Sequence, residues 1–112
     1  MGDRDVVEGD LEARLRKLQE DTARLEEKKR ELEQDLQDIE HQTRRWSDRI
    51  ERGENTPEVE ASKRQLDERR RLNLDDQNTT SHDLETLRKQ REEIEDWMRQ
   101  MQVRGQGGSE ER

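Results

Sequence analysis

Apolar residues recur along the first half of the chain at alternating spacings of four and three residues. The series runs without interruption from Leu11 to Ile50, and nine of its twelve positions are apolar. A strict seven-residue repeat of this kind predicts a long helix in a left-handed coiled coil, because a straight helix drifts by about 20° per heptad against it. The series places Leu11, Leu18, Leu25, Leu32, Ile39 and Trp46 at d, and Leu15, Thr22, Lys29, Leu36, Thr43 and Ile50 at a.

The second half of the chain follows a seven-residue grid less regularly. Between Leu66 and Leu84 the grid meets polar residues. Residues 75–81 consist of Asp, Gln, Asn, Thr and Ser, most of whose side chains compete for backbone hydrogen bonds. We therefore expect one helix over residues 57–104 that is weakened near 75–81. Its apolar grid members are Val59, Leu66, Leu87, Ile94 and Met101 at d, with Leu84 and Met98 at a.

Four residues predict where the two helices begin and end. Asp10 is a suitable N-cap for the first helix, and Gly53 follows the last periodic residues, where glycine adopts a left-handed conformation at low cost. Thr56 suits the N-cap of the second helix, with Pro57 at its first position. The predicted organisation is an acidic tail at 1–10, a helix at 11–52, a break at 53–56, a helix at 57–104 and a Gly-rich disordered tail at 105–112.

The short break predicts that the two helices fold back on each other. Helices joined by so few residues are usually antiparallel neighbours, with residue i facing about residue 109 − i. In this register Leu11 meets Met98 and Ile50 meets Val59, so that seam faces seam. The predicted fold is all-α, an antiparallel two-helix hairpin of the coiled-coil type that self-associates. The alternative is a parallel, extended coiled-coil dimer. The flanking charges do not exclude it, because exposed charge pairs are worth only about 0.2–1 kcal/mol each.

The composition excludes a globular core of ordinary size. Only 23% of the 112 residues are hydrophobic and 48% are charged, against about 45–50% and about 25% in an average soluble domain. The net charge is −8, but both helical segments are nearly balanced. No stretch is apolar enough for a membrane span or a secretory signal. We therefore expect an intracellular, cytoplasmic protein without membrane insertion, and a nuclear location stays open.

The sequence contains no group of residues typical of catalysis, metal binding or cofactor binding. It has no cysteine, no Gly-rich phosphate loop and no nucleophile motif. The two histidines, His41 and His82, fall at position f, farthest from the seam. Asp38 and His41 have the spacing of a metal motif of helical bundles, but that motif requires ligands that face inward. We therefore expect no enzyme activity, no metal and no cofactor.

The seam itself is the main candidate functional feature. It predicts a non-enzymatic interaction protein, namely a scaffold, adaptor or oligomerisation subunit, whose partner is a second copy or another coiled-coil protein. The polar a residues Thr22, Lys29 and Thr43 either fix register and partner choice or are tolerated in a loosely packed rod. The predicted contact residues are Leu11, Leu15, Leu18, Leu25, Leu32, Leu36, Ile39, Trp46, Ile50, Val59, Leu66, Leu84, Leu87, Ile94, Met98 and Met101.

The two tryptophans are the only aromatic residues of the chain. Trp46 lies at d and Trp97 at g of the heptad grids. Tryptophan is enriched among the residues that anchor interfaces, and the alternative is that each simply fills the seam. In the hairpin register Arg14 is placed to stack on Trp97 as a cation–π pair.

Two alternative functions stay open. The basic cluster at 63–71 would suit a nucleic-acid or chromatin accessory factor, but acidic residues interrupt it, so nucleic acid is not the expected partner. The leucines at d resemble the zipper of basic-zipper transcription factors, whose basic region has no counterpart in residues 1–10. The chain is similar in length to prefoldin-type chaperone subunits, which would imply holdase activity. That family places β-hairpins between its helices, and residues 52–62 are too short and too poor in β-branched and aromatic residues for such strands.

Overall fold

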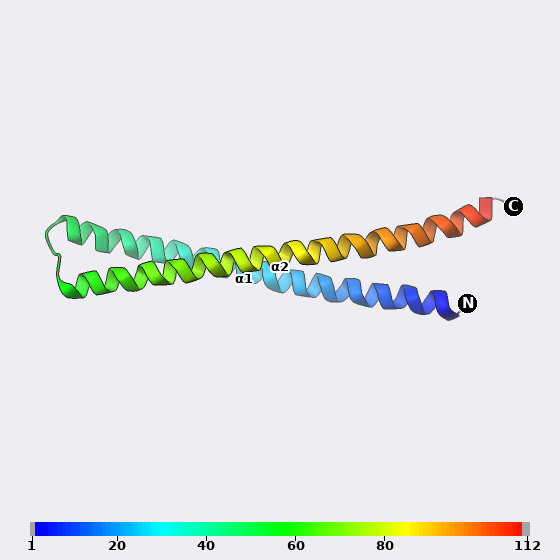
Figure 1. Ribbon diagram of the computed structural model, residues 1–112, viewed down its shortest axis with the longest axis horizontal. Helices are drawn as coiled ribbons and strands as arrows, with labels where there is room; N and C mark the ends of the chain where they lie inside the picture. Colours follow the sequence, from blue (N-terminus) through cyan, green and yellow to red (C-terminus); the bar gives the residue numbers. More distant parts are fainter. Residues whose placement is uncertain (1, 111–112) are drawn as a thin grey trace. The chain divides into compact units, whose positions relative to one another are not determined.

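The protein consists of two helices joined by one turn. A computed structural model describes the backbone of residues 2–110 and the side chains of residues 8–102. Helix α1 spans Gly2–Glu51 and helix α2 spans Pro57–Glu110 (Figure 1). Residues 2–110 contain no strand. The all-α prediction is confirmed, and the break lies where Gly53 and Pro57 predict it.

The contacts within the chain fall into two units, and each helix contributes to both. The turn unit comprises Glu26–His82, so it contains the turn and the adjoining parts of α1 and α2. The terminal unit comprises the part of α1 up to Leu25 together with the part of α2 from Asp83 onward. Each unit therefore pairs one segment of α1 with one segment of α2.

Cross-helix hydrogen bonds show how α1 and α2 pair in the turn unit. Asn73 Nδ2 donates to the backbone carbonyl oxygen of Leu32 at 2.9 Å, and Arg69 Nη2 donates to Asp35 Oδ1 at 3.2 Å. The later residue on α2 contacts the earlier residue on α1, so the two helices run antiparallel. Both contacts lie within about one and a half helical turns of the predicted register. The predicted antiparallel hairpin is thus confirmed in this unit.

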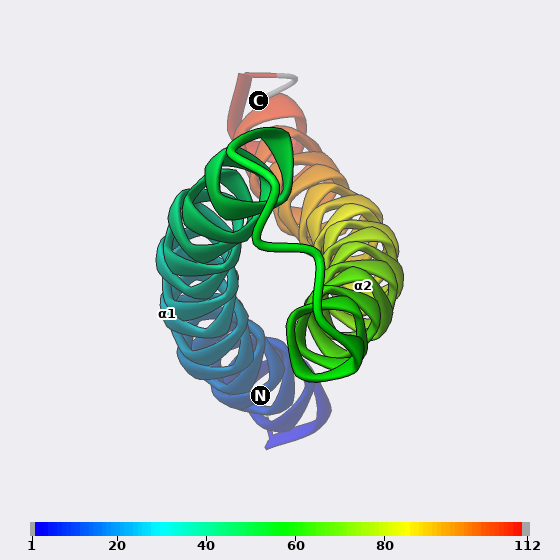
Figure 2. The ribbon, with the colours of Figure 1, turned by 90° about the vertical axis from the view of Figure 1, so that its left-hand side faces the viewer.

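The end of α1 is a Schellman motif, and it lies at the turn that Figure 2 shows in front of the two helices. The amide of Glu54 donates to the carbonyl oxygen of Arg49 at 2.9 Å, and the amide of Gly53 donates to that of Ile50 at 3.0 Å. The motif requires a residue in the left-handed region, and Gly53 supplies it with a φ of 88°. The predicted role of Gly53 is confirmed.

The start of α2 is capped by Thr56. Its Oγ1 accepts a hydrogen bond from the amide of Val59 at 3.3 Å, and its carbonyl oxygen accepts one from the amide of Glu60 at 3.0 Å. Pro57 is the first helical residue, where its missing N–H leaves no bond unmade. Glu58 and Glu60 lie in the first turn, near the positive end of the helix dipole. Local chemistry alone therefore determines where α2 begins.

The core of the turn unit lies on the predicted seam. Ile39 is fully buried, and Val59 and Leu66 are 4% and 5% exposed. Asn73 and Thr80 occupy the next two d positions of α2 and are buried as well. The grid that looked interrupted between Leu66 and Leu84 in the sequence is therefore an inner face with polar members.

Helix α1 begins earlier than the sequence predicts. It starts at Gly2 rather than at Leu11, so the predicted acidic tail is helical from residue 2. Asp10 lies inside the helix instead of capping it, and its carboxylate forms an i,i+4 ion pair with Arg14 at 3.5 Å. Acidic side chains near the start of a helix interact favourably with its dipole, which favours extending the helix through these residues.

Helix α2 is continuous through residues 75–81, where the sequence predicts weakening. Polar side chains there form hydrogen bonds within α2 and do not replace the backbone hydrogen bonds of the helix. Thr80 Oγ1 donates to the carbonyl oxygen of Asp76 at 2.7 Å, and Gln77 Nε2 donates to Asn73 Oδ1 at 2.7 Å. Because both bonds reach back one turn on the same helix, they leave the backbone ladder intact.

Helix α2 also continues past its predicted end. It runs to Glu110, whereas the glycines between residues 105 and 108 predict an end near residue 104. Extending an existing helix adds one hydrogen bond per residue and avoids the cost of nucleation, which favours continuation of α2 through the glycines. The last two residues of the predicted tail, 111–112, lie outside the described residues.

Candidate interaction surface

The terminal unit carries a seam of the same kind as the turn unit but buries fewer of its apolar residues. One is buried in the terminal unit against three in the turn unit, where Leu32, Leu36, Trp46 and Ile50 are half-exposed as well. Among the described residues of the terminal unit Leu11 is the one buried apolar side chain, at 9% exposure. Hydrophobic stabilisation scales with the apolar area removed from water, so a half-buried leucine contributes only part of what a buried one does. The half-buried seam residues of this unit are Leu15, Leu18, Leu25, Leu84, Leu87, Ile94, Met98 and Met101.

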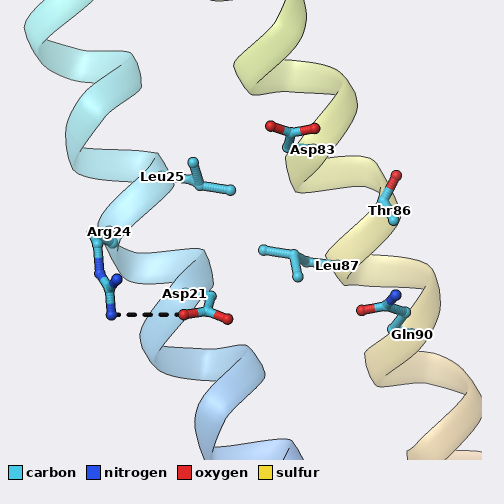
Figure 3. A pocket seen from close by; sticks show the side chains of 7 residues that line it. All are labelled: Asp21, Arg24, Leu25, Asp83, Thr86, Leu87 and Gln90. Carbon is cyan, nitrogen blue, oxygen red and sulfur yellow. Dashed lines mark ion pairs between the residues drawn. The ribbon is translucent and has the colours of Figure 1, made fainter.

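Two hollows lie between α1 and α2 in the terminal unit. The first has a volume of about 350 Å³, and in Figure 3 Leu25 and Leu87 point toward each other across it. The second has a volume of about 440 Å³, and Leu18 and Ile94 line it. Earlier α1 residues share a hollow with later α2 residues, so the helices are antiparallel here too. Together the hollows define the open face: Arg14, Lys17, Leu18, Asp21, Arg24 and Leu25 of α1, and Asp83, Thr86, Leu87, Gln90, Glu93 and Ile94 of α2.

The open face follows directly from the heptad repeat. Its residues occupy positions d, g and c of both grids, which lie on one side of a helix because they recur three or four residues apart. The apolar residues are those at d, and they form the floor of the open face. The residues at g and c are polar or charged and form its two rims, one on each helix.

The two rims of the open face carry opposite net charge. The α1 rim has three cations and one anion, a net charge of +2, and the α2 rim has two anions and no cation, a net charge of −2. On α1, Asp21 Oδ1 lies 3.9 Å from Lys17 Nζ and 3.6 Å from Arg24 Nη2. On α2, neither Asp83 nor Glu93 forms an ion pair with another residue that the structure describes.

Trp97 extends the open face along α2. It follows Gln90 by seven residues, so it lies on the same side of the helix, and it is 49% exposed. The predicted stacking of Arg14 on Trp97 is not found, because Arg14 forms an ion pair with Asp10 instead. Among the described side chains a cation–π pair lies in the turn unit instead, where Arg49 Cζ is 4.8 Å from the centroid of the Trp46 ring.

Arg91 occupies an inner position of the terminal unit. It falls at a on the α2 grid and is half-buried. Its Nε is shielded from solvent and lies 3.7 Å from Glu95 Oε1, which is an ion pair too long for a hydrogen bond. A charged group at an inner position costs packing and desolvation energy. Arg91 therefore opposes close packing of the terminal unit at this position.

Asn73 forms a buried polar layer in the turn unit that we did not predict from the sequence. It is 4% exposed and donates to the Leu32 carbonyl oxygen and, at 3.3 Å, to Asp35 Oδ2. Arg69 donates to the other oxygen of Asp35, so one carboxylate receives two donors from α2. A buried asparagine in a helical seam fixes register at a cost in stability. The signal was present in the sequence, because Asn73 falls at d.

No hydrogen bond to a described residue of the facing helix is found for Thr22, Lys29 and Thr43, the residues predicted to fix register. Thr43 Oγ1 donates to the carbonyl oxygen of Ile39 at 2.7 Å, a bond within its own helix. Thr22 and Lys29 are half-buried, as their a positions predict. A role of these three residues in register or partner choice stays a prediction, whereas Asn73 makes the cross-helix bond that such a role requires.

The basic cluster at 63–71 is largely engaged with carboxylates. Arg69 pairs with Asp35 of α1 at 3.2 Å, and Arg71 Nη2 pairs with Glu68 Oε1 at 2.6 Å. The hydrogen bond from Arg71 lowers the pKa of Glu68 below its ordinary value. Cations neutralised in this way present less positive potential to a phosphate backbone.

Ion pairs lower the pKa of two further glutamates, one in each unit. At the turn, Arg49 Nε donates to Glu54 Oε2 at 2.8 Å, and this bond lowers the pKa of Glu54. In the terminal unit, Arg88 donates to Glu85 and lowers the pKa of that carboxyl, and it also donates to Glu92 at 2.6 Å. All of these groups are exposed, so the pairs make small contributions to stability.

The remaining predicted features concern metal binding and membranes. His41 and His82 are both exposed. Within the described part of the chain, no group of three or more His, Cys, Asp and Glu side chains is placed to hold a metal ion. Over the same residues, neither helix contains a stretch long and apolar enough to cross a bilayer.

Comparisons of the chain with protein-family models, curated proteins and solved structures found no match.

Proposed function

We propose that the protein is a non-enzymatic helical interaction protein, acting as a scaffold, adaptor or oligomerisation subunit. In this proposal the turn unit holds α1 and α2 in register, and the terminal unit docks on another helical surface. The observation that carries the proposal is the half-exposed seam of the terminal unit. Its leucines and isoleucine recur at heptad spacing on both helices and lie between charged rims.

This arrangement has the anatomy of a protein–protein interface. Such interfaces have an apolar centre and a polar rim, and helices commonly bind by laying an apolar face into a groove between other helices. The open face offers a floor of Leu18, Leu25, Leu87 and Ile94 and two hollows that apolar side chains can fill. Trp97 adds a large exposed side chain of the type that anchors interfaces.

The alternative functions receive less support from the described contacts. A phosphate-binding surface needs a concentrated positive face. In the basic cluster at 63–71, Arg69 and Arg71 already form ion pairs with carboxylates of this chain. No contact or hollow in the described residues favours a holdase over a specific interaction protein. Neither alternative is therefore proposed.

Replacement of one floor residue tests the proposal. Leu18→Gln places a polar amide in the floor of the open face while keeping a good helix former. Leu72→Gln is the matched control, because Leu72 is 51% exposed and lies in the turn unit. Association of the full chain, alone and in cell extract, is measured by sedimentation velocity of a labelled protein. We expect Leu18→Gln to weaken association about tenfold and the control to leave it unchanged.

Two results would contradict the proposed function. One is a chain that sediments as a monomer both alone and in extract. The other is an equal effect of Leu18→Gln and Leu72→Gln on association. Circular dichroism of both variants establishes that each retains the helix content of the original chain, so that a loss of association is not a loss of folding.

A further inference from the structure

We infer that the open face binds the open face of a second copy of this chain, with the terminal segment of α1 in one copy lying on the terminal segment of α2 in the other. This inference rests on the proposed function and names its partner. It identifies the surface, the partner and the orientation in which the two copies meet. The charges of the two rims carry it.

The rims distinguish a second copy from an arbitrary apolar partner because they are complementary to each other. The α1 rim has a net charge of +2 and the α2 rim a net charge of −2. A surface that carries both charges side by side is complementary to a rotated copy of itself. A two-fold symmetric interface requires this self-complementarity, because the same patch is used by both subunits.

Symmetry allows two ways of placing one open face on another. A two-fold axis across the helices puts α1 on α1 and α2 on α2, so that rims of equal charge meet. A two-fold axis along the helices puts α1 on α2 of the second copy, so that rims of opposite charge meet. Opposite charges steer and orient association, and equal charges oppose it. The second arrangement also makes every neighbouring pair of helices antiparallel, as in an up-down four-helix bundle.

The axis along the helices also determines which residues meet. Rotation about this axis leaves each residue at the same height, so residues that line one hollow within a copy lie at one level in both copies. Lys17 and Glu93 line the second hollow, and Arg24 and Asp83 line the first. Lys17 of one copy therefore meets Glu93 of the second copy, and Arg24 meets Asp83. Symmetry repeats both pairs, and both carboxylates lack an ion pair with any described residue of their own chain.

The apolar floor of the open face is buried by the same arrangement. Leu18, Leu25, Leu87 and Ile94 are half-buried in the single chain, and in the pair they form the inner layers between four helices. Trp97 lies one turn beyond Ile94 on the same side of α2. In the second copy the residue at that height is near Arg14, so the cation–π pair expected from the sequence would form between copies rather than within one.

Reversing the charge of one rim at a time tests the orientation. The α1-rim variant, Lys17→Glu with Arg24→Glu, changes the α1 rim from +2 to −2. The α2-rim variant, Asp83→Lys with Glu93→Lys, changes the α2 rim from −2 to +2. In each variant both rims have the same sign, so the self-association of each is expected to be about tenfold weaker, or more. The two variants mixed in equal amounts are expected to associate again, because every rim then meets one of opposite sign.

A matched control separates the rim effect from a general change of net charge. Arg16→Glu with Lys89→Glu makes the same change of net charge as the α1-rim variant, at exposed b and f positions that lie off the open face. We expect its self-association to equal that of the original chain. Sedimentation equilibrium at low and high salt reports all of these associations, and the defects of the rim variants should diminish at high salt because exposed charges are screened. Circular dichroism monitors folding, and recovery in the mixture shows that each rim variant is folded.

The results that overturn this inference differ from those that overturn the proposed function. If both rim variants self-associate as strongly as the original chain, or if their mixture does not recover, the orientation is wrong. If the original chain is a monomer at every concentration but enters a complex in extract that Leu18→Gln abolishes, the second copy is wrong while the proposed function stands. If Leu18→Gln behaves like Leu72→Gln, the proposed function itself fails.

Discussion

The turn unit and the terminal unit carry seams of the same heptad kind but bury them to different depths. The turn unit has Ile39, Val59 and Leu66 at 5% exposure or less, whereas Leu11, at 9%, is the most buried apolar residue described in the terminal unit. The difference does not come from the number of apolar residues on the grid, because two of the four d residues of α2 in the turn unit are polar, whereas Leu87, Ile94 and Met101 in the terminal unit are all apolar. A heptad pattern therefore predicts which face of a helix is apolar, but not how closely that face is covered.

Two features of the chain explain the difference. The Schellman turn joins the helices directly in the turn unit, so the entropy cost of bringing their facing residues together is small there and grows with the length of the intervening chain. Both units have a half-buried charged residue at an inner position, Lys29 in the turn unit and Arg91 in the terminal unit. The turn unit also has Asn73, which forms hydrogen bonds to α1, whereas the shielded Nε of Arg91 has no hydrogen bond and only a long ion pair on its own helix. A satisfied polar residue permits close packing, and an unsatisfied one opposes it.

The largest expected effect compares a fully buried seam residue with a half-buried one. Ile39→Ala removes a side chain with no exposure, and we expect it to destabilise the protein by about 2–5 kcal/mol. Leu15→Ala removes a half-buried side chain of the terminal unit outside the open face, and we expect a loss of about 1–2 kcal/mol. Urea unfolding followed by circular dichroism measures both at one protein concentration. Equal losses would show that the two units are packed alike and would break the comparison.

A smaller effect is expected at the polar layer. Asn73→Ala removes the donor to the Leu32 carbonyl oxygen and to Asp35 from a buried position, and we expect a cost of about 1–3 kcal/mol in the same unfolding measurement. Thr80→Val is the matched control, because Thr80 is equally buried but its hydroxyl bonds within α2. We expect this control to cost less than Asn73→Ala. The opposite order would show that Asn73 contributes volume rather than a cross-helix bond.

The sequence predicts the turn and the seam because both depend on the conformational preferences and spacing of residues that are close together along the chain. Gly53, Thr56 and Pro57 each have a conformational or capping preference that one residue type satisfies, and the structure uses all three as expected. The sequence does not predict the polar layer, because Asn73 is one of the polar residues that interrupt the apolar grid and Thr80 lies in the stretch whose side chains compete for backbone hydrogen bonds. Whether such residues interrupt a helix or bond inside it depends on what the facing helix offers, here the Leu32 carbonyl oxygen and Asp35, and no pattern on one helix reveals that.

The open face was predicted only in part, for a related reason. Its floor residues, such as Leu18 and Leu87, follow from the d positions of the grid. Its rims consist of g and c residues, which become a surface only when two helices are paired at a particular distance and register. The two hollows exist only between the paired helices, since residues of both α1 and α2 line each of them. Pairwise geometry of this kind is absent from a heptad pattern.

The smallest expected effect compares Glu54 of the turn unit with Glu85 of the terminal unit, two of the three glutamates whose pKa is lowered. Folding holds the Glu54 pKa below its ordinary value of 4.5 because Arg49 donates to the carboxylate, so the pair stabilises the fold above that pH and loses its effect as the pH falls through the lowered pKa. Glu54→Gln should therefore lower Tm slightly near pH 7 and match the original chain once the pH is below the lowered pKa of Glu54. Glu85→Gln should behave alike in the terminal unit, where Arg88 is the donor. A Tm difference that persists in acid would show that the Glu54 side chain acts through packing at the turn rather than through its charge.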